Sequence, residues 1–244
     1  EELQKALPVP SEVNRLDENS LSLTGGFDLA AHPLFMEGKF TVMGESAMLA
    51  CRALGDVAGK RVLDACAAPG GKSADLYSLA RNVISLTCFE LYPHRKELLD
   101  KTLARLHVSA ETFCKSAAEY DPAYDAAFDA VLIDAPCSGL GLLGDKPDIR
   151  YSKSDADIVS LVAIQKEILS VCARYVKPSG SLVYATCTIS RRENEDQVAA
   201  FLKNHSEFTL EEIPIPLSNE GQIQLLPHVH NTDGFYISRM RRCI

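Results

Sequence analysis

The stretch Asp64–Leu76 reads DACAAPGGKSADL, and its glycine turn decides which kind of nucleotide fold this chain can adopt. A phosphate-binding P-loop carries a glycine five positions before the glycine that precedes its lysine, but that position here is Cys66. A dinucleotide-binding turn has the spacing G-x-G-x-x-G, whereas Gly70 and Gly71 are adjacent. The turn therefore predicts a ligand other than ATP or NAD.

Apolar runs that read as strands alternate with segments of helical period on both sides of this turn. Such alternation predicts an α/β, Rossmann-like fold with a mostly parallel twisted sheet and helices on both faces. A segment KPSG is expected to end the longest helix, and the last two strands are expected to pair at the edge of the sheet. The expected strands are 61–66, 83–90, 111–116, 128–136, 181–187, 208–213 and 234–242, and the expected helices are 72–81, 93–107, 155–175 and 193–202.

Residues 1–58 stand outside this alternation. They read as a short polar hairpin within 12–26, a loop, and a helix near Glu45–Leu54. We expect an N-terminal extension over 1–58, a remnant of a linking subdomain, followed by one catalytic domain over 59–244.

Composition narrows the class of protein. The chain has 244 residues, 46% hydrophobic and 24% charged, with a formal net charge of −8, which disfavours a strongly basic nucleic-acid surface over the whole molecule. No apolar run is long enough to span a bilayer, so we expect no membrane partner. The eight cysteines include no C-x-x-C pair, so we expect no metal and a reduced, cytoplasmic protein.

Chemically reactive residues follow the expected strands at their carboxyl ends, where ligands bind in sheets of this kind. Glu90 ends the second strand, 26 residues after Asp64, and is either a ribose ligand or an ordinary solvated carboxylate. A ribose without a phosphate loop favours S-adenosylmethionine as the cofactor.

Two cysteines, Cys137 in DAPCSG and Cys187 in YATCTISRRENED, each follow a buried strand. One such cysteine is often a packing residue, but two at one edge beside a cofactor turn favour function. Methylation at carbon 5 of a pyrimidine fits them, since a thiolate that adds to carbon 6 makes carbon 5 nucleophilic. A carboxyl such as Asp134 can supply a proton or hydrogen bond near N3, and a second thiol can act when the proton on carbon 5 leaves.

Three segments carry a family resemblance, and it extends over about residues 27–242. DACAAPGGKSADL, DAPCSGLGLLGDKPDIRY and YATCTISRRENEDQV resemble motifs of the Sun (Fmu) family of RNA cytosine-5 methyltransferases. The resemblance implies an S-adenosylmethionine-dependent methyltransferase fold and a small-subunit (16S) ribosomal RNA substrate. It also implies a monomer and an N-terminal RNA-binding domain that this chain does not include.

The resemblance assigns roles to matching positions. Cys187 is the implied nucleophile, Cys137 assists release, Asp134 contacts the base and the cofactor, and Lys72 positions both. Since a thiol near the cationic sulfonium of the cofactor and near Lys72 tends to a lowered pKa, we expect this for both cysteines. Glu90 is the implied ribose ligand, and the implied cradle for the methionine end is Cys66, Ala67, Ala68, Pro69, Gly70, Gly71 and Lys72.

Two alternatives remain at this point, together with one departure from the family. In a DNA cytosine-5 methyltransferase the thiol after the fourth strand attacks, so Cys137 would be the nucleophile. A non-catalytic RNA-binding assembly factor could use the same fold. Lys115 and Ser116 stand where the family usually has an acidic residue, so the resemblance assigns no adenine contact.

Overall fold

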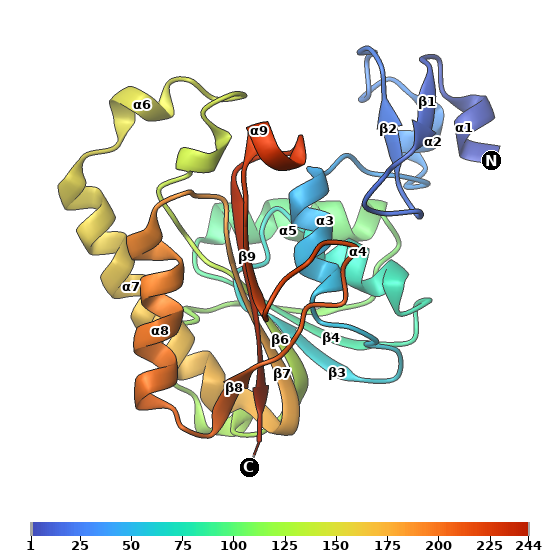
Figure 1. Cartoon of the computed structure of the whole chain (residues 1–244). Helices are drawn as coiled ribbons and strands as arrows, with labels where there is room; N and C mark the ends of the chain where they lie inside the picture. Colours follow the sequence, from blue (N-terminus) through green and yellow to red (C-terminus); the bar gives the residue numbers. More distant parts are fainter. Residues whose placement is uncertain (1, 244) are drawn as a thin grey trace.

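A twisted eight-stranded sheet forms the centre of the protein (Figure 1), which is described here from a computed structural model over residues 2–243. The strand order is β5-β4-β3-β6-β7-β10-β8, and β9 also pairs with β10. The five strands from β5 to β7 in this order (β5, β4, β3, β6 and β7) are parallel to one another. Strand β10 is antiparallel to its neighbours β7, β8 and β9. The strands are β3 (Arg61–Asp64), β4 (Ser85–Glu90), β5 (Glu111–Cys114), β6 (Phe128–Asp134), β7 (Val176–Thr186), β8 (Phe208–Leu210), β9 (Gln222–Leu225) and β10 (Phe235–Arg242).

Helices cover both faces of this sheet, which confirms the predicted fold class. On one face α3 (Glu45–Arg52), α4 (Gly71–Leu79) and α5 (Pro93–Arg105) contribute buried leucines to one core cluster. On the other face α7 (Asp155–Tyr175) and α8 (Glu195–Asn204) pack against a second cluster. Short helices α6 (Ile149–Ser152) and α9 (Pro227–His230), and 3₁₀ turns η1 (Pro122–Tyr124), η2 (Leu140–Leu142) and η3 (Arg191–Glu193), lie in the connections.

The long helix α7 has the predicted bounds, because its first turn carries a complete capping box. The Ser154 hydroxyl accepts a hydrogen bond from the Asp157 backbone, and the Asp157 carboxylate accepts one from the Ser154 backbone. The following segment differs from expectation. Strand β7 begins at Val176 directly after the helix, and the segment 177–180 bulges out between the pairs Phe128–Val176 and Ala130–Ser181.

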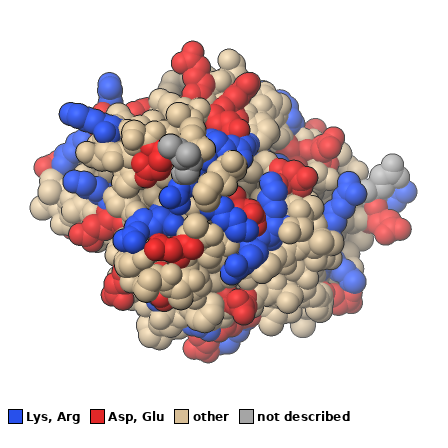
Figure 2. Space-filling view, turned by 90° about the horizontal axis from the view of Figure 1, so that it is seen from below, with Lys and Arg blue, Asp and Glu red and all other residues tan. Residues whose placement is uncertain are grey.

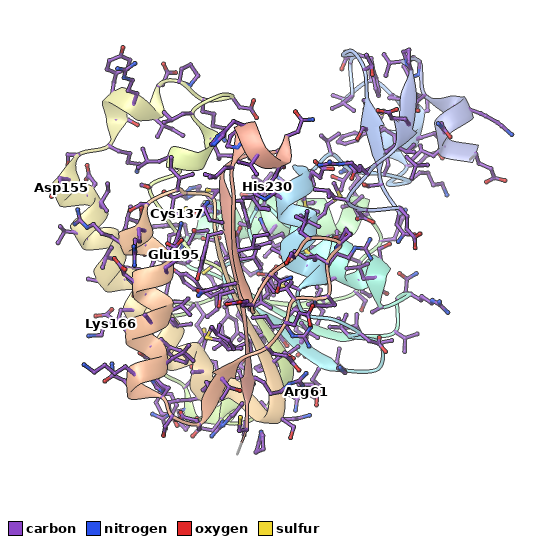
Figure 3. All side chains as sticks on the ribbon, in the orientation of Figure 1. Arg61, Cys137, Asp155, Lys166, Glu195 and His230 are labelled. Carbon is purple, nitrogen blue, oxygen red and sulfur yellow. The ribbon has the colours of Figure 1, made fainter. Side chains whose placement is uncertain are left out.

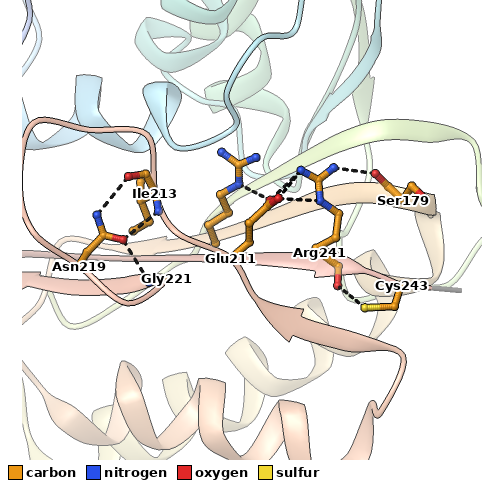
Figure 4. Close-up of polar contacts among 8 residues, drawn as sticks. Ser179, Glu211, Ile213, Asn219, Gly221, Arg241 and Cys243 are labelled. Carbon is orange, nitrogen blue, oxygen red and sulfur yellow. Dashed lines mark hydrogen bonds and ion pairs between the residues drawn. The ribbon is translucent and has the colours of Figure 1, made fainter.

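A carboxylate that follows the edge strand β8 binds two arginines of β10 (Figure 4). Glu211 accepts hydrogen bonds from Arg239 at 2.7 Å and from Arg241 at 2.6 and 2.7 Å. Asn219 closes the neighbouring loop through the backbone of Ile213 and Gly221. Since β10 pairs with β7 from Tyr236 to Arg241, these contacts also hold the strand that delivers Cys187.

The N-terminal residues form the predicted hairpin and helix. Strands β1 (Ser11–Val13) and β2 (Leu21–Leu23) pair antiparallel after α1 (Glu2–Ala6), and α2 (Pro33–Met36) precedes α3. An ion pair of 2.5 Å between Asp17 and Arg52 joins the hairpin to α3, whose apolar side lies in the core. The boundary between residues 58 and 59 stays a prediction. Within residues 2–243, no helix combines the length and apolarity that crossing a membrane requires.

Candidate active site

The carboxyl ends of β3, β6 and β7 bring four predicted catalytic residues together as two contacting pairs. Lys72 Nζ donates a hydrogen bond of 2.8 Å to Asp134 Oδ2, and the sulfur atoms of Cys137 and Cys187 lie 3.2 Å apart. Cys137 lies near the α9 end of the molecule, whereas Arg61, at the start of β3, lies at the opposite end (Figure 3).

The pKa values of the two thiols are shifted in opposite directions. A hydrogen bond from Cys137 lowers the pKa of the Cys187 thiol, and Lys72 lowers it further, although burial and Asp134 oppose this. The same hydrogen bond, together with burial, raises the pKa of Cys137. The expectation of two thiols with lowered pKa is therefore wrong for Cys137, because a donor in such a pair must keep its proton.

Lys72 remains a cation although its side chain is mostly buried. Burial alone would lower the pKa of its ammonium, but the charge and hydrogen bond of Asp134 outweigh this and raise it. The ring of Phe235, with its centroid 5.7 Å from Nζ, covers the ammonium on another side. The pair therefore presents a fixed positive and negative charge beside the thiols.

The glycine turn wraps closely over α5. Gly70 has a φ of +107°, and a Cβ atom on it would lie 3.0 Å from Leu99 Cδ1, so only glycine fits there without strain. The side chains of Ala67 and Ala68 pack into the core, so the turn can offer a ligand mainly its backbone. The free N–H groups at the start of α4 favour an anion, such as a carboxylate, at this end of the helix.

Glu90 lies at the predicted place, at the end of β4, and is 3% exposed. Its Oε1 accepts a hydrogen bond from the Tyr92 backbone, and its Oε2 lies 3.7 Å from Arg95. Arg95 in turn donates to the Ala68 carbonyl, so Glu90 and the glycine turn are held against each other. Lys115, where the family usually has an acidic residue, forms an ion pair with Asp121.

Asp64 is a site residue that the sequence reasoning did not single out, although it opens the quoted motif. It is 1% exposed, and its Oδ2 accepts a hydrogen bond of 2.6 Å from Ser73. Burial raises the pKa of its carboxyl to about 6, an effect that Ser73 and the Cys66 backbone only partly offset. Its Oδ1 is buried and has no hydrogen bond of good geometry with any described residue. A buried oxygen in this state is unusual in a folded protein and fits a missing donor.

A cleft of about 610 Å³ lies elsewhere, between the N-terminal hairpin and α4. It is lined in part by Asn14, Met43 and Asp75, and none of the predicted site residues is among its described lining residues. Size alone therefore does not locate the chemistry in this fold. Among residues 2–243, no group of three or more His, Cys, Asp or Glu side chains could hold a metal ion.

Comparison with known proteins matches this arrangement to one family. The family model described as 16S rRNA methyltransferase RsmB/F matches residues 52–241. The chain belongs to the RsmB/F methyltransferase family. This confirms the resemblance to the Sun (Fmu) family that the thiol motifs carry.

Two curated relatives show how much of the family protein this chain represents. "Probable ribosomal RNA small subunit methyltransferase B" of Bacillus subtilis (strain 168) is 39% identical over 243 residues, covering 95% of this chain and 54% of that protein. "Ribosomal RNA small subunit methyltransferase B" of Shewanella oneidensis is 37% identical over 227 residues, covering 92% and 53%. This RsmB/F chain thus spans about half the length of these relatives.

Solved structures agree on the fold. The protein described as PH0851 superposes with a TM-score of 0.93 at 30% identity, over 98% of this chain and 56% of that one. NSun6 from Pyrococcus horikoshii superposes with a TM-score of 0.81 at 25% identity, over 92% and 60%. That structure was solved with SFG, an analogue of S-adenosylmethionine.

Proposed function

We propose that this chain carries the catalytic part of an S-adenosylmethionine-dependent methyltransferase that modifies carbon 5 of a cytosine in small-subunit (16S) ribosomal RNA. The observation that carries the proposal is the pair of thiols, 3.2 Å apart, beside the Lys72–Asp134 ion pair. Carbon 5 methylation needs a nucleophile for carbon 6 and a second group for release, and this pair provides two thiols whose pKa values are shifted in opposite directions.

Cys187 is the nucleophile in this proposal because its thiol has the lowered pKa. It adds to carbon 6 of the cytosine, and the ring must then gain a proton or hydrogen bond near N3. Asp134 would supply it from its protonated form, which it must reach when the base is bound, and Lys72 holds the carboxyl in place. Afterwards the proton on carbon 5 must leave and the bond between carbon 6 and Cys187 must break. Cys137 starts as a thiol because of its raised pKa and lies close to Cys187. After it gives its own proton to solvent, it would accept the proton from carbon 5, and the electron pair of that C–H bond would expel Cys187 as a thiolate.

The residues around the glycine turn fit S-adenosylmethionine, which supplies an electrophilic methyl group when bound. Asp64 Oδ1 is a buried acceptor without a good donor, and an ammonium group would satisfy it. The segment from Cys66 to Lys72 offers backbone N–H groups at the start of α4, and Glu90 offers a carboxylate for ribose hydroxyls. The adenine contact stays unassigned.

An RNA substrate must be bound by a part of the molecule with suitable charge. The face seen from below carries Lys and Arg intermixed with Asp and Glu (Figure 2), and ion pairs such as Lys177–Asp129 and Arg241–Glu211 use up cations. This face is a poor candidate for phosphate contact. We propose that an N-terminal RNA-binding domain outside this chain supplies much of the affinity. The monomeric state and the cytoplasmic location stay predictions.

Methyl transfer tests the proposal directly. The protein is incubated with radiolabelled S-adenosylmethionine and unmodified small-subunit RNA, with duplex DNA of matched cytosine content as the control, and the labelled nucleotide is then mapped. We expect 5-methylcytosine at a defined position in the RNA and no label in the DNA. Label in DNA would favour the DNA-type enzyme, and cofactor binding without transfer to either would favour a non-catalytic assembly factor.

A further inference from the structure

Glu193 is a buried carboxylate that the mechanism above does not use. It is 0% exposed and ends the 3₁₀ turn η3, six residues after Cys187. A carboxylate in such a place costs free energy unless donors surround it, so its contacts indicate what it does.

Both oxygens of Glu193 accept hydrogen bonds, and the donors come from both thiol motifs. Oε1 accepts from the Ser138 backbone N–H at 2.8 Å and from Gln165 Nε2 at 3.1 Å. Oε2 accepts from the Ser138 hydroxyl at 2.6 Å and lies 3.4 Å from the Thr188 hydroxyl. The two hydroxyls are themselves 2.8 Å apart.

Ser138 directly follows Cys137, and Thr188 directly follows Cys187. One carboxylate therefore holds the backbone of the first thiol loop and, through two hydroxyls, the second. The 3₁₀ turn that carries Glu193 is itself held in place, because the Tyr184 hydroxyl donates a hydrogen bond of 2.7 Å to the Glu193 carbonyl. A single rigid group thus spans the gap between the loops one residue away from each sulfur atom.

We propose that Glu193 is a positioning residue. It sets the distance between the sulfur atoms of Cys137 and Cys187 and thereby maintains the hydrogen bond that Cys137 donates to Cys187. The S–H···S contact of 3.2 Å lowers the pKa of the Cys187 thiol, so a small parting of the loops weakens the contact and removes thiolate from Cys187. The inference rests on the proposed function only where it predicts a slower methyl transfer. The placement of the two loops follows from the hydrogen bonds to Glu193 and does not depend on the proposed function.

Glu193→Gln preserves the volume but not the pattern of acceptors. If the amide nitrogen takes the place of Oε1, it faces the donors Ser138 N–H and Gln165 Nε2. If it takes the place of Oε2, both hydroxyls must turn around. Either way a buried donor loses its acceptor, which strains the connection between the loops.

The first readout needs no RNA. Whole protein is treated with iodoacetamide at several pH values, and alkylation of Cys187 is followed by mass spectrometry. In Glu193→Gln the rise of alkylation should move to higher pH, with a rate at pH 7 that is about 3–10-fold below the unsubstituted protein, since thiolate is the reacting form. The matched control is Asp196→Asn, an exposed acid that pairs with Arg191 at the surface, and its profile should not change.

The second readout is single-turnover methyl transfer to small-subunit RNA. Displacement of reacting groups by up to an ångström lowers rates by as much as about 100-fold, so we expect a 10–100-fold loss in Glu193→Gln with S-adenosylmethionine affinity unchanged within about twofold. Failure of the proposed function would leave the unsubstituted protein without transfer. Failure of this inference would show as an unchanged alkylation profile in the variant.

Ser138→Ala provides a milder version of the same test. It removes the contacts of the Ser138 hydroxyl with Glu193 and with Thr188 but leaves Glu193 its Ser138 backbone and Gln165 donors. The carboxylate therefore stays partly satisfied, and this variant serves as the test if Glu193→Gln does not fold. The alkylation profile of Cys187 should shift in the same direction, by a smaller factor of about 2–5. Cooperative unfolding shows that a variant is folded. If Ser138→Ala, and Glu193→Gln where it folds, unfold cooperatively and keep the alkylation profile of the unsubstituted protein, the proposal is overturned.

Discussion

Replacing Cys137 with alanine separates the roles of the two thiols. The change removes the sulfur atom 3.2 Å from Cys187 and little else, since alanine is shorter by one atom. A hydrogen bond to a charged acceptor contributes about 1.5–3 kcal/mol, and a thiol is a weak donor, so about 1.4 kcal/mol is a reasonable loss. This corresponds to about tenfold less thiolate at Cys187 at a fixed pH.

The same variant should slow the attack but block the release. With small-subunit RNA and S-adenosylmethionine, Cys137→Ala should still form the bond to carbon 6 and then accumulate as a protein–RNA adduct that survives denaturing electrophoresis. Cys187→Ala should form no adduct and transfer no methyl group, while its cofactor affinity, measured by calorimetry, stays unchanged. Cys243→Ala, at an exposed cysteine far along the chain, is the control and should behave as the unsubstituted protein.

The reverse pattern would refute the assignment. An adduct in Cys187→Ala and none in Cys137→Ala would make Cys137 the nucleophile, as in DNA cytosine-5 methyltransferases. Activity that survives both substitutions, with no adduct in either, would exclude covalent catalysis by these residues.

Three further perturbations test the cofactor and RNA parts of the proposal. Glu90→Ala should weaken S-adenosylmethionine binding by about 1–3 kcal/mol, and unchanged calorimetric affinity would remove Glu90 from the ribose role. Burial raises the pKa of Asp64 from 3.8 to about 6, so the folded state holds a proton that the unfolded state has lost between these values, and stability falls as pH rises through them. Asp64→Asn should therefore gain about 2 kcal/mol in free energy of unfolding relative to the unsubstituted protein between pH 4 and pH 7, measured by urea titration; a constant difference would contradict the shift. The chain alone should bind RNA weakly with a shallow salt dependence, and a steep slope in filter binding would show that it neutralises many phosphates itself.

Most of the sheet could be predicted because its strands are short, apolar and followed by turn residues. The helical period predicts the bounds of α7 correctly. The structure adds the physical reason, because Ser154 and Asp157 cap one end and Val176 starts a strand at the other. Strand β9 was missed, since Gln222–Leu225 alternates polar and apolar residues over only four positions and is stabilised by pairing with β10. The bulge at 177–180 was missed for a related reason, because proline and glycine there read as a stop rather than as an irregular strand.

The residues of the candidate site that belong to recognisable sequence motifs could be predicted. Cys137, Cys187, Lys72 and Asp134 lie together as the strand-end rule requires. The sequence did not say which thiol donates to the other, because that depends on the charges and burial around each sulfur. It also did not mark Glu193, since a glutamate after two arginines looks like a solvated surface residue until the fold buries it.

Two buried carboxylates of the site, Glu193 and Asp64, differ in how they are satisfied, and this difference separates their roles. Glu193 meets donors at both oxygens, all from the protein, so its arrangement is complete before any ligand arrives. Asp64 meets a firm donor at one oxygen only, and its pKa is raised as a result of burial that the protein does not fully offset. A complete network fixes geometry, whereas an incomplete one stores free energy that a ligand donor can recover. S-adenosylmethionine should therefore stabilise the folded protein by an amount that depends on Asp64 and rises with pH through about 6, while the contribution of Glu193 should be the same with and without the cofactor.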